Sequence, residues 1–94
     1  MEHGKDLCER LFRFSFDVIR FLKESNSTTE TAVLKYQLTK AASSSGANYG
    51  ESQAALSRAD FWNKISISLK EMRESHYWLR ILKALDIGDR ETRD

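Results

Sequence analysis

The sequence predicts an all-α protein built from three long helices. Its 94 residues include no proline and four glycines, whereas sheet proteins with many tight turns usually need more of both. Apolar residues recur at spacings of three and four, which is the period of a helix with a buried face. Polar stretches divide this pattern into segments that we expect to form helices at about residues 5–24, 29–56 and 57–87, within one domain that spans residues 1–94.

The first segment carries more apolar surface than one neighbouring helix can cover. One stripe consists of Leu7, Leu11, Phe14, Val18, Phe21 and Leu22, and a second stripe consists of Cys8, Phe12, Phe16 and Ile19. The polar run at residues 25–29 is expected to end this helix. Ser27 followed by Glu30 has the spacing of a capping box, which predicts the start of the second helix.

The second segment contains a run of small residues from Ala41 to Ala47, with three serines and Gly46. Glycine costs about 1 kcal/mol relative to alanine in a helix, so one interpretation is a loop that splits the segment into two short helices. The other is a continuous helix whose small side chains let neighbouring backbones approach closely. We favour the continuous helix, with Leu38, Tyr49 and Leu56 anchoring its ends.

The third segment is expected to begin with Ser57 as a cap and Asp60 in the first turn. Gly88 is a suitable residue for the end of the helix. Residues 88–94 are then left as the start of a fourth helix. The side chains expected in the core or at a subunit seam are Phe61, Ile65, Trp78 and Leu79.

Two motifs follow one another in this region. The first is Ser44-Ser45-Gly46-Ala47-Asn48-Tyr49-Gly50-Glu51-Ser52, and the second comprises Asp60-Phe61, Lys64, Ile67, Leu69-Lys70-Glu71, Glu74-Ser75 and Tyr77-Trp78-Leu79. In identity, order and separation they resemble the four-helix-bundle proteins encoded in bacterial 23S ribosomal RNA intervening sequences. The resemblance covers about residues 7–87.

The resemblance implies an up-and-down antiparallel four-helix bundle and a cyclic homo-oligomer, a pentamer. The biochemical activity of the family is poorly defined. It includes accessory proteins of reverse transcriptases in diversity-generating retroelements, which bind nucleic acid and the polymerase through a basic surface. This chain departs from the family pattern because it stops at Asp94, so we expect the fourth helix to be short or absent.

Oligomerisation also follows from the residues themselves. At about 1.5 Å per residue the second and third helices would each exceed roughly 40 Å, and thin rods bury less surface than a globule. The residues expected to mediate helix packing or assembly are Ala41, Ala42, Ser45, Gly46, Asn48, Tyr49, Glu51, Phe61 and Trp78. For Asn48 and Glu51 two alternatives remain open, which are hydrogen bonding across helices to fix the register and simple exposure to solvent.

Residues suited to catalysis are sparse. Glu71 and Glu74 do not stand at the i, i+3 spacing from His76 that metal sites in helical bundles use. The serines lack a Gly-x-Ser-x-Gly context, and no glycine-rich phosphate loop is present. We therefore expect a protein that is not an enzyme and holds no metal or other cofactor.

Basic residues recur on two of the expected helices. Arg13 and Arg20 are seven residues apart, as are Arg73 and Arg80, and Lys83 follows. Repetition around a ring would concentrate these charges into a patch that contacts phosphates. The formal net charge is only +1, which keeps two function classes open. One is a scaffold that binds RNA, DNA or a ribonucleoprotein partner such as a reverse-transcriptase-like protein, and the other is an assembly that binds only protein.

Compartment is indicated by three features. No apolar run reaches the ~20 residues that a membrane-spanning helix needs, and the N-terminus lacks the pattern of a signal peptide. Cys8 is the one cysteine, so an internal disulfide is excluded. These features predict a cytoplasmic protein without membrane contact.

Overall fold

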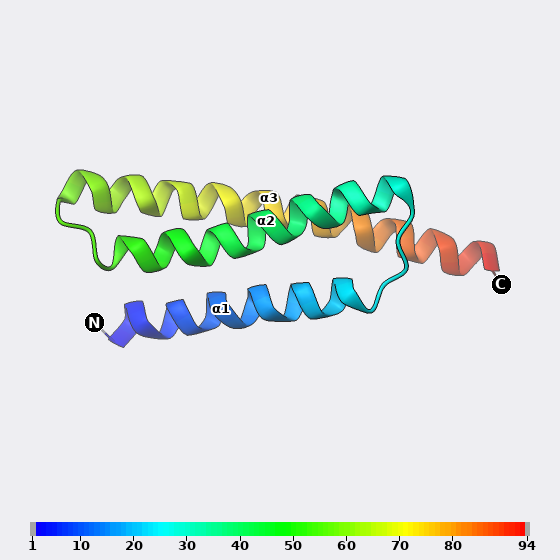
Figure 1. The fold of residues 1–94 in the computed structure, drawn as a ribbon, viewed down its shortest axis with the longest axis horizontal. Coiled ribbons are helices and arrows are strands. Elements are labelled where there is room, and N and C mark those ends of the chain that lie inside the picture. Colours follow the sequence, from blue (N-terminus) through cyan, green and yellow to red (C-terminus); the bar gives the residue numbers. More distant parts are fainter. Residues whose placement is uncertain (1, 94) are drawn as a thin grey trace.

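The computed structural model describes residues 2–93, with side chains described for residues 4–85. Within this range the chain forms three α-helices and no strand: α1 (Glu2–Lys23), α2 (Thr29–Ser52) and α3 (Arg58–Arg93). The helices run up, down and up, and α2 packs against both of the others (Figure 1). The predicted all-α class is confirmed, and residues 2–93 contain no fourth helix.

The molecule is elongated. Its principal extents are 54 × 21 × 16 Å, and α3, with 36 residues, has the length to set the long axis. The C-terminal part of α3 reaches beyond the loop that joins α1 to α2 (Figure 1). Such a thin bundle leaves each helix with at least one face that no other helix covers.

The connection between α1 and α2 differs from the expected cap. The capping box is formed by Thr28 and Thr31, whose side chains each accept a hydrogen bond from the other residue's backbone N–H, at 3.2 and 2.8 Å. The predicted pair of Ser27 and Glu30 is therefore wrong by one position. Ser27 instead accepts a hydrogen bond at 2.9 Å from Lys35, which also donates to two backbone carbonyls of the loop.

The connection between α2 and α3 begins earlier than expected. From Gln53 to Ala55 the backbone N–H groups bond to carbonyls three residues back, so the last turn of α2 tightens and the helix ends at Ser52. Leu56 therefore lies outside the helix and is fully exposed, and its predicted anchoring role is wrong. The predicted cap at Ser57 is confirmed, because its hydroxyl accepts from the Asp60 N–H at 3.0 Å.

The third helix does not stop at Gly88. It continues to Arg93, so residues 88–93 extend α3 and do not start another helix. A glycine ends a helix when it takes up a left-handed conformation, and no glycine among the described residues has a positive φ angle.

The core lies where all three helices meet. Its buried residues are Val18, Leu22, Leu38, Ala42 and Leu82, with Phe14, Leu34, Trp78 and Leu79 packed against them. The side chains of α1 and α3 thus meet over the middle and first half of α2. No helix within the searched residues has an apolar stretch long enough to cross a membrane.

Candidate interaction surfaces

The small-residue run is part of one continuous helix, as predicted, since α2 spans residues 29–52 without interruption. Ala41, Ala42 and Ser45 are buried against the neighbouring helices. Gly46 is half-buried, and an added Cβ there would lie 3.5 Å from the Cβ of Leu11, which is an ordinary contact. Close helix approach therefore depends on Ala42 and Ser45, whereas the position of Gly46 has room for a methyl group.

Two serines join the helices through this run. The hydroxyl of Ser15 on α1 donates to the carbonyl of Ala42 at 2.9 Å, and that of Ser68 on α3 donates to the carbonyl of Ser45 at 2.7 Å. Neither hydrogen bond was predicted from the sequence. The available signal was a serine on the apolar face of each helix, Ser15 beside Leu11 and Ser68 seven residues before the buried Ser75.

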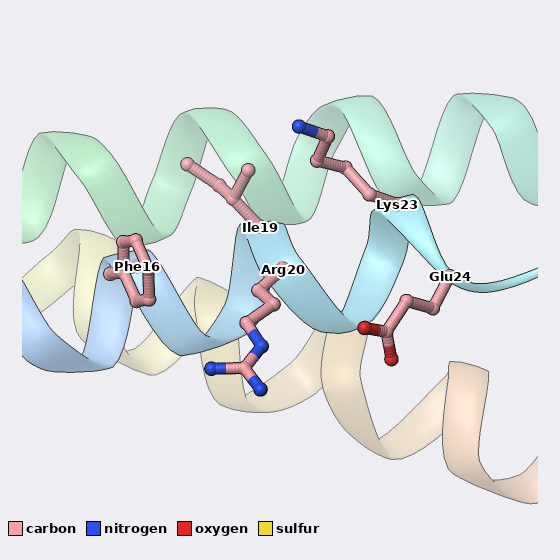
Figure 2. A pocket seen from close by; sticks show the side chains of 5 residues that line it. All are labelled: Phe16, Ile19, Arg20, Lys23 and Glu24. Atoms are coloured by element: carbon pink, nitrogen blue, oxygen red, sulfur yellow. The ribbon is translucent and has the colours of Figure 1, made fainter.

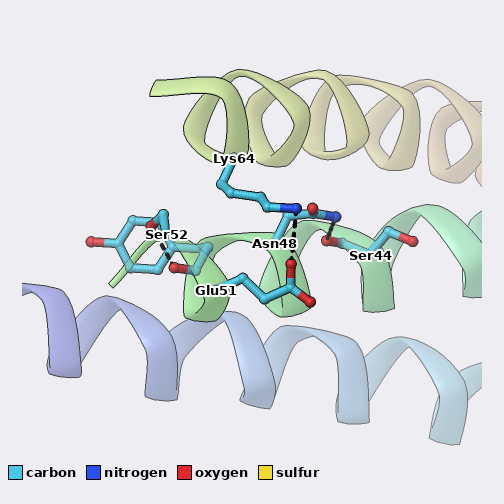
Figure 3. Close-up of polar contacts among 6 residues, drawn as sticks. Ser44, Asn48, Glu51, Ser52 and Lys64 are labelled. Carbon is cyan, nitrogen blue, oxygen red and sulfur yellow. Dashed lines mark hydrogen bonds and ion pairs between the residues drawn. The ribbon is translucent and has the colours of Figure 1, made fainter. Parts of the chain in front are cut away.

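Asn48 and Glu51 behave differently from one another. The Asn48 side chain donates to the Ser44 carbonyl of its own helix at 2.9 Å, so it forms no hydrogen bond across helices (Figure 3). Glu51 reaches Lys64 on α3, with 3.1 Å between the carboxylate and ammonium groups (Figure 3). The Glu51 side chain is 62% exposed, and a pair this open to solvent contributes ~0–1 kcal/mol. Neighbouring Tyr49 is half-buried.

Phe61 and Trp78 are both half-buried on α3. Phe61 packs edge-on against Trp62 with ring centroids 5.2 Å apart, and Trp78 packs against the core. The indole N–H of Trp78 is buried and has no hydrogen-bond partner within the described part of the chain. Both aromatic residues thus contribute to the intramolecular packing predicted for them.

The predicted basic residues lie on the surface of two helices. Arg13 and Arg20 are exposed on α1, and Arg73, Arg80 and Lys83 are exposed on α3. Arg20 and Lys23 border an open hollow with Phe16, Ile19 and Glu24 (Figure 2). Arg13 borders another hollow together with Glu9 and Asp17. The stripe on α1 therefore alternates basic and acidic side chains.

An apolar groove runs between α1 and α2. We call it the α1–α2 groove, and it is lined by Cys8, Phe12, Ser15, Phe16, Ile19, Ser43, Gly46 and Ala47. None of these side chains is charged. Phe12 is 65% exposed and Phe16 50% exposed, so the second apolar stripe of α1 has no intramolecular partner that covers it.

A second apolar surface lies on α3. We call it the α3 apolar face, and it consists of Trp62 and Leu69, which are seven residues apart and therefore on one stripe of the helix. Trp62 is 58% exposed and Leu69 is 50% exposed. Neither residue lines the α1–α2 groove, so the two surfaces share no helix.

The described residues offer binding surfaces and few groups suited to chemistry. Within the part searched, no three His, Cys, Asp or Glu side chains come together in a group that could hold a metal ion. Cys8 is a half-buried free thiol on the wall of the α1–α2 groove. What the geometry provides is apolar area for association and exposed cations for contact with anions.

Long antiparallel helices, a core of small and apolar residues and no strand within residues 2–93 define a helical-bundle protein. The chain belongs to the family of 23S rRNA-intervening sequence proteins, whose family model matches residues 5–94. This match confirms the resemblance of the two sequence motifs. No curated protein and no solved structure gives a significant match to the chain.

Proposed function

We propose that this protein is a non-catalytic scaffold that assembles from several copies of itself into a ring. The observation that supports this proposal is the amount of exposed surface. The chain exposes 7280 Å², whereas a folded monomer of 10.9 kDa is expected to expose about 5,600 Å². The excess of about 1,700 Å² matches the total area of a standard protein–protein interface, roughly 1,600 Å².

The chemical nature of the exposed surface supports the same proposal. Large side chains that are at least 36% exposed occur on all three helices and include Phe12, Phe16, Phe21, Tyr36, Trp62 and Leu69. Contiguous exposed apolar patches of more than a few hundred Å² are rare on soluble monomers. Association with further copies would remove this surface from water at ~25 cal/mol per Å² of apolar area.

Nucleic-acid contact is the second part of the proposal. Arg13, Arg20, Arg73, Arg80 and Lys83 are exposed, and within residues 4–85 none of them has a carboxylate oxygen within 4.0 Å. A ring would repeat these cations around its axis and attract phosphates, although each chain has a net charge of only +1. The ligand would be RNA, DNA or a ribonucleoprotein that contains a reverse-transcriptase-like protein.

Size-exclusion chromatography with light scattering, recorded at 260 and 280 nm, tests the assembly. We expect one species of several subunits at micromolar concentration. A monomer across the whole concentration range would contradict the scaffold proposal. Excess absorbance at 260 nm that high salt removes would support binding of nucleic acid.

A charge-removal pair tests the nucleic-acid part directly. In the test variant Arg13, Arg20, Arg73 and Arg80 are replaced by glutamine, and in the control variant the exposed residues Lys5, Lys40, Arg58 and Lys70 are replaced in the same way. For every arginine that binds a phosphate, its replacement should reduce the salt slope of single-stranded RNA binding by about 0.7. Equal slopes for the two variants would instead favour an assembly that binds only protein.

A further inference from the structure

We propose that copies join head to tail, with the α3 apolar face of one copy seated in the α1–α2 groove of the next. This inference rests on the proposed self-assembly and assigns the surfaces that carry it. It requires that the two surfaces be complementary in shape, free of unpaired charge and placed so that a ring can close.

The groove has the lining expected of a receptor for bulky side chains. Its α2 wall consists of Ser43, Gly46 and Ala47, which are small, while Phe12 and Phe16 rise from α1 on the other side. The volume of the groove is about 440 Å³, which is in the range of pockets that hold large organic groups. No charged side chain lines it, so an apolar occupant would leave no charge buried and unpaired.

The α3 apolar face presents the complementary shape. Trp62 and Leu69 project from successive turns of a helix that is exposed on this side, with the exposed Ser66 between them. Trp is among the residues most often found as an anchor at the centre of an interface. Large side chains on one surface and small ones on the other allow close packing, whereas either surface against its own copy would pair large with large or small with small.

The surplus area fits two contacts per chain. In a ring each copy uses both a groove and an α3 apolar face, and a standard interface takes ~800 Å² from each partner. Two such contributions amount to about 1,600 Å², close to the surplus of about 1,700 Å² over the surface expected for a monomer of this mass. A symmetric dimer through one surface would cover only about half of that surplus.

Both surfaces lie at the same height along the bundle. Ser68, which precedes Leu69, is bonded to the Ser45 carbonyl at 2.7 Å, and the adjacent Gly46 lies against Leu11 between the groove residues Cys8 and Phe12. Copies with parallel axes can therefore join face to groove without a shift along the axis. A head-to-tail contact closes into a ring when successive copies are related by rotation alone, and it grows into a filament when a translation is added.

A mixing experiment separates this arrangement from a symmetric contact. Ala47→Glu places a charge in the groove and leaves the α3 apolar face intact, whereas Leu69→Glu does the reverse. Both residues are exposed in the single chain, so the fold should survive, as checked by circular dichroism. Leu56→Glu is the control, because Leu56 is fully exposed in the loop and belongs to neither surface.

We expect the wild-type protein and the Leu56→Glu variant to form the same multi-subunit species, and each of the other two variants alone to be a monomer. An equimolar mixture of Ala47→Glu and Leu69→Glu should form a heterodimer of twice the subunit mass, because one intact contact remains. Phe12→Glu mixed with Trp62→Glu should give the same result and serves if a first variant unfolds.

Three outcomes would overturn the inference while leaving self-assembly in place. They are a mixture that stays monomeric, a groove or face variant that keeps the wild-type mass, and a wild-type species that lengthens without limit as concentration rises. A wild-type monomer would instead contradict the proposed scaffold itself, so the two failures are distinguishable.

Discussion

The side-chain hydroxyl of Ser68 donates a hydrogen bond to the main-chain carbonyl of Ser45 at 2.7 Å and so joins α3 to the middle of α2. One turn away on α2, the carbonyl of Ala42 accepts a hydrogen bond from Ser15 of α1 at 2.9 Å. A carbonyl oxygen has two lone pairs, so each can accept this bond in addition to its helical one. The small-residue run is therefore the point at which hydrogen bonds tie both outer helices to α2.

Replacing Ser68 by alanine should lower the free energy of unfolding by about 1 kcal/mol, the usual contribution of one intramolecular hydrogen bond. The Ser45 carbonyl keeps its bond within α2, so no larger penalty is expected. Urea denaturation followed by circular dichroism measures the change. Ser66→Ala is the control on the same helix, since Ser66 is exposed, and equal midpoints for the two variants would contradict the role assigned to Ser68.

Gly46 should respond to substitution in opposite directions according to size. Gly46→Ala should raise the free energy of unfolding by up to about 1 kcal/mol, because alanine favours the helix and its Cβ meets Leu11 only at contact distance. Gly46→Leu should lower it by ~1–3 kcal/mol, as overpacking does. Thermal denaturation of both variants checks the sign, and a destabilised Gly46→Ala would show that the backbone contact requires glycine.

Gly50 provides an independent comparison. Nothing lies within 4 Å of a Cβ added at this position, so Gly50→Ala should raise the free energy of unfolding by about 1 kcal/mol through helix propensity alone. Ala42→Leu should have the opposite effect, since Ala42 is fully buried between the helices. A Gly50→Ala variant less stable than the wild type by urea denaturation would indicate that this face of α2 is covered in the assembly.

The number, order and approximate limits of the helices could be predicted because they depend on local periodicity and on polar breaks. The cap of α2 could not be placed to the residue, since Ser27 and Thr28 are both suitable caps and backbone geometry decides between them. The bond from Ser68 to Ser45 depends on the register of two helices 23 residues apart in sequence. Such a register is fixed by side-chain packing across helices, which periodicity along one helix does not specify.

The corrected cap can be tested by comparing adjacent positions. Thr28→Ala removes the side chain that accepts from the Thr31 N–H at 3.2 Å and should cost about 1 kcal/mol of stability. Ser27→Ala removes a hydroxyl that is not the cap and should cost less. Chemical denaturation of the two variants gives the comparison, and a larger loss for Ser27→Ala would restore the pair of Ser27 and Glu30 as the capping box.

Lys35 should fix the loop between α1 and α2. Its ammonium group donates to the carbonyls of Ser25 and Asn26 at 3.1 and 2.7 Å and to the Ser27 hydroxyl at 2.9 Å. Lys35→Met keeps most of the aliphatic stem but leaves these acceptors to water, and the partly exposed site limits the expected loss of stability to about 1 kcal/mol. Hydrogen exchange of the amides at residues 24–28 should become faster, whereas Lys40→Met should leave it unchanged, because Lys40 is exposed and forms no side-chain hydrogen bond within the described residues. Unchanged exchange in Lys35→Met would show that the Thr28 cap alone holds the loop.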